Sequence, residues 1–281
     1  MRNGKSFVLV SLLALGLMSC GSKSDKSKEL VSDFFKAVSD TTYKVKASDV
    51  YPTFDSLHVA IKTDVLDLND MVEEKNGEYQ VSGVNNYTNE RGVFKQDSVR
   101  FYIAYDEKAK DLRIVDSKGL VAMPEYLAEF SKYLGVTTKG MKDSKLSELA
   151  SKLEDFYRSK GLDALIDLYA KVKISYWDWE TSYSNEPHGQ AWVVNNSDVT
   201  ISNIKYIVSY YDSKDGFISD DTGTACSSLK PGEKYRFTFW TSHVKNPSRA
   251  NLKLDFGSSN IEQILYSKGY TKADFDDFCK K

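Results

Sequence analysis

The amino-acid sequence predicts an α+β fold: a mixed domain over residues 28–122, a helical connector over 123–170 and an all-β sandwich over 171–257. Three observations in the 281-residue chain predict this order. Apolar residues first recur at helical spacing, then alternate as in strands, then return to helical spacing. From Lys171 to Phe256, short alternating stretches are separated by turn residues, which is typical of packed β-sheets.

A basic start and a short apolar run open the chain. The run covers residues 7–18 and is followed by Ser19 and Cys20. It is shorter than the roughly 18 apolar residues that a membrane-crossing helix needs, so the pattern predicts a secretory signal peptide over residues 1–19. The Ser- and Lys-rich stretch that follows, residues 20–27, is predicted to be a flexible tether.

The sequence Leu17-Met18-Ser19-Cys20 resembles the lipobox of bacterial lipoproteins. The resemblance implies that the chain is cut before Cys20, that the Cys20 thiol is acylated and that the lipid bilayer is a partner. Each buried acyl CH₂ contributes about 0.8 kcal/mol, so several chains anchor a protein stably. Gly21 in place of Asp implies the outer rather than the inner membrane. The membrane face stays open, and a core helix with a chance cysteine is the alternative.

The composition predicts folded domains and disfavours nucleic acid as a partner. Hydrophobic residues make up 41% of the chain and aromatic residues 13%, which is enough to form cores. The formal net charge is −2, whereas nucleic-acid-binding domains carry strongly basic patches. We therefore expect a protein or glycan partner in the envelope and no nucleic acid.

The first domain is predicted to open with a helix over residues 28–38 and to end as a strand meander. Pro52 interrupts the stretch between them and predicts either two short helices or a helix and a bend. Alternation places four residues on one strand face: Val99, Phe101, Ile103 and Tyr105. The helix with two aromatics, the short helices and a meander ending in LRIVDSKGL together resemble the NTF2-like cone fold. The resemblance implies a pocket between sheet and helices, used for catalysis by some members and for binding by many.

His58 is the one histidine of this domain and the candidate base of a pocket enzyme, a hydrolase or an isomerase. A catalytic histidine needs an orienting acid, and Asp55 and Asp64 are the nearby candidates. A partly exposed helical histidine is the alternative, and we assign no catalytic residue. No cofactor or metal is expected, since His188 and His243 lie apart without metal-ligand spacing.

The connector is predicted to hold three helices, beginning near Pro124, Asp143 and Leu162, with Gly161 ending the second. Their apolar stripes predict packing on a neighbouring domain, and a partner-binding groove is the alternative. Beyond the sandwich, residues 258–281 are predicted to form a helical tail.

Alternation in the first sandwich strand predicts that Val172, Ile174 and Tyr176 face the core. Trp177 and Trp179 would then share the opposite face, where an aromatic pair can stack on sugar rings. Packing of both tryptophans under the connector or at a domain interface is the alternative, because large exposed apolar patches are uncommon without a partner.

The sandwich resembles the FxLYD-type, immunoglobulin-like domains of bacterial envelope proteins. The resemblance rests on four features: a strand ending in Asn195-Asn196, a long strand ending in Tyr211-Asp212, a turn at Gly216, and Leu-x-Pro-Gly-Glu over residues 229–233. It implies a module for spacing or binding without catalysis.

Two cysteines remain besides Cys20, namely Cys226 and Cys279. The compartment beyond the inner membrane permits a disulfide between them. Because spacing in the sequence does not fix geometry, two unrelated thiols are an equal alternative.

Together these patterns predict a membrane-anchored envelope lipoprotein with a non-enzymatic binding or scaffolding role. Asp-Ser/Thr-apolar triplets beginning at Asp40, Asp55 and Asp97 resemble O-glycan acceptor sites of Bacteroidota envelope proteins. The alternatives are a glycan-binding lipoprotein of a nutrient-uptake system and a pocket enzyme in the first domain. The ligand and the oligomeric state stay open.

Overall fold

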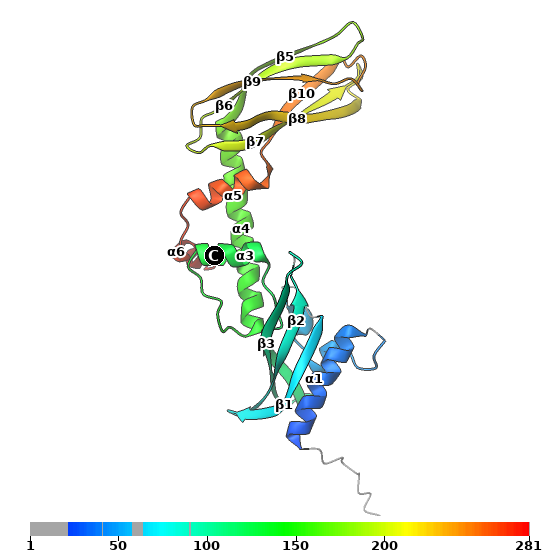
Figure 1. The fold of residues 1–281 in the computed structure, drawn as a ribbon, viewed down its shortest axis with the longest axis vertical. Helices are drawn as coiled ribbons and strands as arrows, with labels where there is room; N and C mark the ends of the chain where they lie inside the picture. Colours follow the sequence, from blue (N-terminus) through cyan, green and yellow to red (C-terminus); the bar gives the residue numbers. More distant parts are fainter. Residues whose placement is uncertain (1–21, 41, 58–63, 90, 281) are drawn as a thin grey trace, which may run out of the picture. The chain divides into compact units, whose positions relative to one another are not determined.

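A computed structural model describes residues 22–40, 42–57, 64–89 and 91–280. The chain divides into two compact units, one made of Met1–Ala122 with Gly140–Ser147 and one of Met123–Lys139 with Glu148–Lys281. Both helices and antiparallel sheets are present, which confirms the predicted α+β class (Figure 1). Within the described residues, no helix has the length and apolar character to span a membrane.

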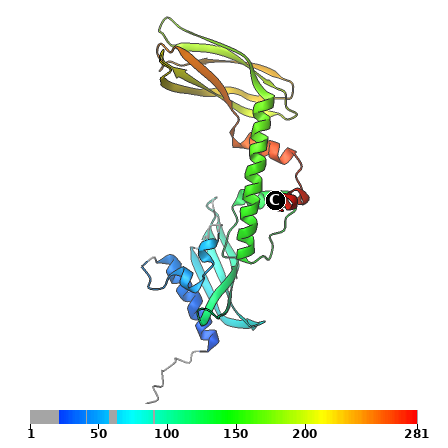
Figure 2. The ribbon, with the colours of Figure 1, turned by 180° about the vertical axis from the view of Figure 1, so that it is seen from behind.

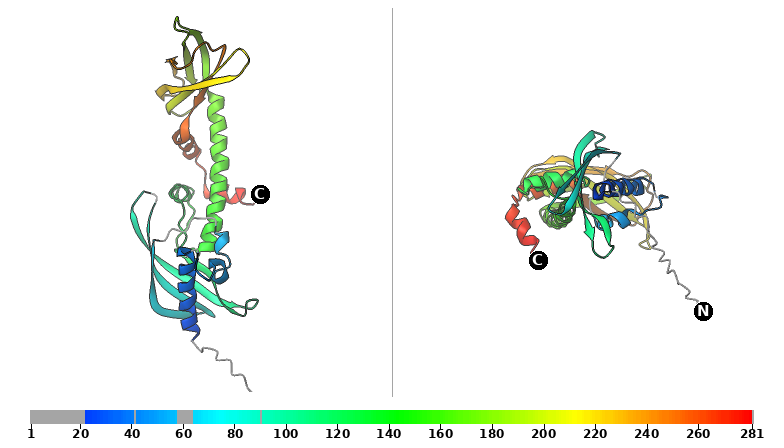
Figure 3. Two further views of the ribbon diagram at one scale, coloured as in Figure 1. Left: turned by 90° about the vertical axis from the view of Figure 1, so that its right-hand side faces the viewer. Right: turned by 90° about the horizontal axis from the view of Figure 1, so that it is seen from below.

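The first unit is a four-stranded antiparallel meander with a helix on one face (Figure 3). Its strands follow one another in the sheet in chain order: β1 (Val65–Lys75), β2 (Glu78–Thr88), β3 (Phe94–Asp106) and β4 (Asp111–Lys118). Asn76 and Gly77 join β1 to β2 with positive φ angles, the backbone that a two-residue hairpin turn requires.

Helix α1 (Lys23–Ser39) begins inside the stretch that the sequence predicted as tether. The Ser22 hydroxyl accepts a hydrogen bond from the backbone N–H of Asp25, and the Asp25 carboxylate accepts one from the backbone N–H of Ser22. This reciprocal capping box satisfies two N–H groups at the helix end, and it explains why helix replaces tether from Lys23 onward.

Aromatic rings fill the space between α1 and the sheet. Phe34 on α1 meets Tyr51, Phe54 and Phe101 edge-on, with ring centroids 5.5, 5.1 and 5.9 Å away. Tyr51 follows the short helix α2 (Ala47–Val50), and Phe54 begins the short helix η1 (Phe54–Ser56) after Pro52. Of the two arrangements predicted from the proline, the structure has the two short helices. This side of the sheet is therefore a packed core.

The connector contains two helices, α3 (Glu125–Tyr133) and α4 (Asp143–Lys171), where the sequence predicted three. Helix α4 runs through Gly161 without a break (Figure 2). Gly161 does not take the positive φ of a terminating glycine, so the predicted helix end is wrong. A side-chain atom of Ile261 lies 3.8 Å from where a Cβ on Gly161 would stand, which places a packed neighbour there.

Two three-stranded antiparallel sheets follow α4 and share one hydrophobic core. Their orders are β5–β6–β9 and β10–β7–β8 (Figure 1). The strands are β5 (Val172–Thr181), β6 (Pro187–Asn195), β7 (Ile201–Tyr211), β8 (Phe217–Leu229), β9 (Lys234–Trp240) and β10 (Arg249–Asp255). Rings from both sheets meet inside, with Tyr206 stacked on Phe237 at 5.2 Å.

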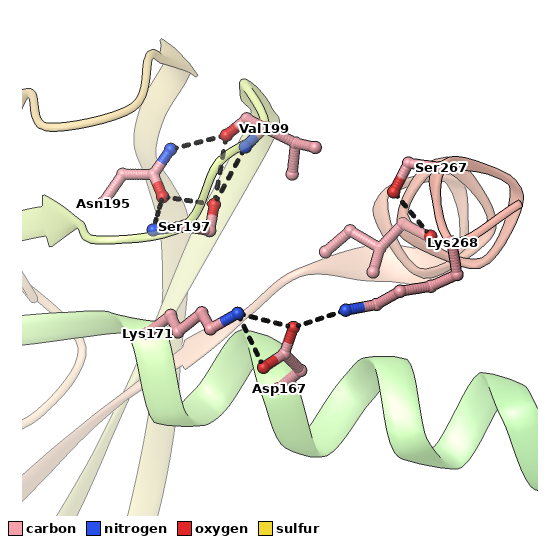
Figure 4. Close-up of polar contacts among 8 residues, drawn as sticks. Asp167, Lys171, Asn195, Ser197, Val199, Ser267 and Lys268 are labelled. Carbon is pink, nitrogen blue, oxygen red and sulfur yellow. Dashed lines mark hydrogen bonds and ion pairs between the residues drawn. The ribbon is translucent and has the colours of Figure 1, made fainter.

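The predicted helical tail consists of α5 (Gly257–Ser267) and α6 (Lys272–Phe278). At the end of α5, Lys268 lies 3.2 Å from the Asp167 carboxylate, which Lys171 also binds at 3.0 Å (Figure 4). The hydrogen bond from Lys171, with the added bond from Lys268, lowers the pKa of Asp167. The tail is thus tied to α4 by an ion-pair triad.

Asn195 fixes the corner where β6 ends. Its fully buried amide donates to the carbonyl of Val199, and its Oδ1 accepts from the backbone and hydroxyl of Ser197 (Figure 4). The amide also donates to the carbonyl of Leu229. A buried amide with all its bonds formed is stabilising, whereas an unpaired one is costly. This asparagine therefore gives the predicted strand end a physical cause.

Candidate functional site: the outer face of the β5–β6–β9 sheet

The outer side of the β5–β6–β9 sheet carries an aromatic and polar surface, which we call the aromatic face. Antiparallel register arranges it in three rows across the strands: Tyr176–Trp192–Arg236, Asp178–Gln190–Thr238 and Glu180–His188–Trp240. Rings stand in the first and third rows, and smaller polar side chains stand between them. On the outer face of the other sheet, rings stand at one end, in the row Arg249–Tyr211–Phe217, whereas the three central rows carry none: Lys205–Thr224–Asp255, Ile207–Thr222–Lys253 and Ser209–Asp220–Asn251.

A bulge in β5 decides which residues belong to this face. Ile174 pairs with Val193 but Tyr176 pairs with Trp192, so Ser175 is an extra residue in β5. An extra residue reverses the inward and outward alternation beyond it. Tyr176, predicted to lie in the core, is therefore 53% exposed.

The same bulge turns Trp177 and Trp179 inward, which corrects their predicted exposure. Both pack against the core that the two sheets share, and the ring of Trp179 meets Tyr210 at 6.3 Å. Across the sheet they face the small residues Ala191 and Gly189. They support the aromatic face from below instead of forming a stacking pair on it.

A shallow cavity of about 360 Å³ lies mainly along the second and third rows of the aromatic face. It is lined in part by Asp178, His188 and Thr238. Gly189 forms part of its floor. A Cβ at this position would stand 2.5 Å from the Phe239 ring and 2.9 Å from Trp179. The missing side chain therefore lets these two rings close beneath the cavity.

Hydrogen bonds hold several side chains of the aromatic face in place. The Tyr176 hydroxyl donates to Asp178 at 2.9 Å, and this bond raises the pKa of the tyrosine. His188 Nε2 lies 3.2 Å from Glu180. The Trp240 indole N–H donates to Glu186 at 3.0 Å. Bonds from Lys245 and then from Trp240 lower the pKa of Glu186, so this acceptor stays ionised at neutral pH.

Trp192 and Trp240 are not among the site residues predicted from the sequence, although the alternation of apolar residues beside them indicates their orientation. Ala191, Val193 and Phe239 lie in the core, so strict alternation sends the tryptophans beside them outward. Trp192 is half-buried beneath Lys234, whose Nζ lies 4.9 Å from the ring centroid. Trp240 is 62% exposed.

The possible disulfide is not formed in the structure, where Cys226 and Cys279 are both free thiols. Cys226 lies buried in the two-sheet core, whereas α6, which ends just before Cys279, packs its Phe275 and Phe278 on Phe156. Phe156 precedes the start of β5 by about 24 Å of helix, at 1.5 Å per residue. The two cysteines are therefore held by different parts of the unit.

Other predicted sites are scattered or lie outside the described residues. Cys20 and His58 fall outside them, so the structure does not bear on lipidation or on that histidine. His188 belongs to the aromatic face, whereas His243 contacts Ser219 at 3.4 Å. Within the described ranges, no group of three or more His, Cys, Asp or Glu side chains could hold a metal ion.

The first unit has a buried acidic cluster, but its oxygens are occupied. Asp143 accepts hydrogen bonds from the Ser117 hydroxyl at 2.6 Å and from the backbone N–H groups of Gly119 and Leu120 at 3.0 Å. Asp116 accepts from the backbone and hydroxyl of Ser144. These bonds join the start of α4 to β4, which is a structural role.

Comparisons with known proteins place the chain in no family. No family model matches it, and no curated protein matches it. Among solved structures it is similar to a crystal structure of a DUF1425 family member from Shewanella sp. pv-4, with 12% sequence identity and a TM-score of 0.24. That similarity covers 31% of this chain and 78% of the other, and a TM-score this low carries no argument about fold or function.

Proposed function

We propose that the chain is a lipid-anchored, non-enzymatic binding protein of the bacterial cell envelope, with the aromatic face as its binding surface. The observation that carries the proposal is the exposed pair Tyr176 and Trp240 on a rigid sheet, 53% and 62% exposed. Within their rows, Tyr176 lies beside Trp192 and Trp240 lies beside His188. Contiguous exposed apolar surface that is rimmed by polar side chains marks interaction sites. The lipid anchor rests on the lipobox pattern that ends at Cys20.

The proposal also includes finer fold assignments for the two units. We propose that the first unit is NTF2-like and that the two-sheet unit is an immunoglobulin-like, FxLYD-type sandwich. One helix against an antiparallel meander favours the former, and two three-stranded sheets around a shared core favour the latter. A fold by itself does not determine function, so the binding role rests on the face.

An enzyme in the first unit is the weaker candidate. Phe34, Tyr51 and Phe101 fill the side of the sheet where an NTF2-like pocket would lie. The carboxylates of Asp116 and Asp143 are engaged by backbone and serine donors. A general acid or base needs a proton-transfer partner within hydrogen-bond reach. The contacts of Asp116 and Asp143 give these two acids structural roles instead.

Cosedimentation tests the binding role. The full chain, extracted from membranes in detergent, is mixed with detergent-washed envelope fragments, so that the lipid cannot insert. We expect the chain to sediment with the fragments and Trp240→Ala to sediment about tenfold more weakly. Phe217→Ala is the matched control, because Phe217 lies on the other sheet and is also 62% exposed. Equal sedimentation of Trp240→Ala and the unaltered chain would reject the aromatic face.

The anchor is tested in the same cells. Cys20→Ser is placed on the Trp240→Ala background, so that binding through the aromatic face does not hold the chain on the envelope. This double variant should leave the membrane fraction, because the serine hydroxyl does not replace the thiol in lipidation. A double variant that still fractionates with membranes would remove the anchor from the proposal.

A further inference from the structure

Building on the proposed function, we propose that the ligand of the aromatic face is a neutral oligosaccharide. Its rings would stack on Tyr176 and Trp240, and its hydroxyls would bond to the polar row between them. The chemistry of the face, its charge, its size and its rigidity each favour this class of ligand over a protein or a charged polymer.

The two exposed rings stand at diagonal corners of the aromatic face. Tyr176 is on β5 in the first row and Trp240 is on β9 in the third. Four residues along a strand and two strands across separate them, which is about 14 Å by about 10 Å. Aromatic rings present a negative π-face, which attracts the C–H groups on one side of a pyranose ring. Two such platforms this far apart suit a chain of sugars better than a single one.

The row between the platforms offers both hydrogen-bond donors and acceptors. Asp178 only accepts, and its Oδ2 already takes bonds from the Tyr176 hydroxyl and the Gln190 amide. The Gln190 amide and the Thr238 hydroxyl donate and accept. Next to them Arg236 in the first row only donates. Each sugar hydroxyl is itself a donor and an acceptor, so neighbouring hydroxyls need this mixture. A surface built for phosphate or sulfate would instead gather cations.

The aromatic face carries charges of both signs. Its three rows hold Asp178, Glu180 and Arg236, and Lys234, which lies against Trp192, adds a second cation next to the first row. Over the face and this lysine, two acidic and two basic side chains therefore balance. Long-range attraction of a charged polymer requires a field of one sign, so the balance favours an uncharged ligand.

The size of the surface also favours a glycan. The cavity of about 360 Å³ falls in the range of about 300–1,000 Å³ that is typical of small-ligand sites. A stable protein interface needs about 800 Å² on each partner with an apolar centre. Polar side chains occupy the centre of this face.

The aromatic face is held in one arrangement before any ligand arrives. Its residues lie on paired strands over the packed rings of Trp177 and Trp179, and Glu186 holds the indole of Trp240 at 3.0 Å. A preformed site loses less conformational entropy on binding. A preformed arrangement therefore favours binding of an oligosaccharide to an open, shallow site such as this one.

The test uses an array of neutral and acidic oligosaccharides probed with the detergent-extracted full chain. Neutral chains of several sugars should bind. Tyr176→Ala and Trp240→Ala should each weaken binding roughly tenfold, which equals about 1.4 kcal/mol, and Phe217→Ala should not. Trp240→Tyr should restore most of the affinity, because it returns a ring. Tyr176→Ala gives an independent answer if Trp240→Ala fails to fold.

Protease treatment of the envelope fragments separates failure of this inference from failure of the proposed function. Cosedimentation that survives protease and is inhibited by soluble neutral oligosaccharides supports the glycan. Cosedimentation that protease abolishes, with no neutral glycan bound on the array, overturns the glycan but keeps the binding role. Binding restricted to acidic glycans, or binding to which Tyr176 and Trp240 contribute nothing, also overturns the inference.

Discussion

Asp143 carries a carboxylate in the interior of the first unit, with no part of it exposed. Burial raises its pKa, and the bonds from Ser117, Leu120 and Gly119 act against that rise. A carboxyl whose folded pKa is raised contributes stability that is complete below its unfolded pKa, near 3.9. That contribution is lost as the pH rises through the folded pKa. The Ser117 hydroxyl and the backbone N–H groups of Gly119 and Leu120 satisfy the carboxylate in its ionised form.

Replacing Asp143 by Asn tests this account. The amide has one acceptor oxygen, so its NH₂ group must face an N–H or O–H donor, and we expect a loss of about 1–3 kcal/mol in the free energy of unfolding. The loss should grow as the pH falls from 7 to about 4, since only the unaltered chain gains stability by protonation of residue 143. Urea denaturation followed by far-ultraviolet circular dichroism measures both effects.

The exposed Asp55 in the same unit provides the control for that experiment. Asp55→Asn should change the free energy of unfolding by less than about 0.5 kcal/mol, as is usual for surface positions. A difference between Asp143→Asn and the unaltered chain that stays constant with pH would contradict the buried-charge account.

At the scale of elements, regular patterns predicted the structure well and single irregular residues did not. Helix α1, the meander and most strands of the second unit follow from apolar spacing. The bulge at Ser175 carries no apolar signal, yet it exchanges the roles of Tyr176 and Trp177. Because side chains in a strand alternate, one extra residue inverts every assignment after it. Sequence alone therefore misplaced the candidate site while predicting its strand.

Strand β8 and helix α4 show two other limits of the sequence. The polar sequence of β8 gave no strand signal, and its pairing with β7 comes from the neighbouring strand. Gly161 predicted a helix end, but packing of α5 against that turn retains the helix. A glycine in the interior of a helix costs about 1 kcal/mol relative to alanine. The burial of one large apolar side chain contributes more than this.

Gly161→Ala distinguishes a continuous α4 from two shorter helices. In a continuous helix the new methyl meets Ile261 at 3.8 Å, an ordinary contact, and stability should rise by about 0.5–1 kcal/mol. At a terminating glycine with positive φ, alanine would instead lower stability. Urea denaturation followed by tryptophan fluorescence gives the sign, because all four tryptophans belong to the two-sheet unit.

At the scale of the whole molecule, the chain combines an N-terminal stretch that resembles a lipobox with two units whose cores are each filled by their own side chains. The sequence predicted this order of parts, and the structure supports the α+β class. The proposed binding surface emerged only when the register joined three strands that are separated by up to 64 residues, from Tyr176 to Trp240. Rows across a sheet have no signature along the chain, so a sequence read in order cannot show them.

The distribution of tryptophans allows a direct measurement of the central claim, that the aromatic face binds an envelope glycan. Trp177 and Trp179 pack in the core, whereas Trp192 and Trp240 lie on the face. Acrylamide quenching of the unaltered chain and of Trp240→Phe is measured with and without the soluble glycan fraction from detergent-washed, protease-treated envelope fragments. We predict that saturating glycan protects the unaltered chain from acrylamide and protects Trp240→Phe much less. Quenching that stays the same while the glycan is bound would contradict the claim.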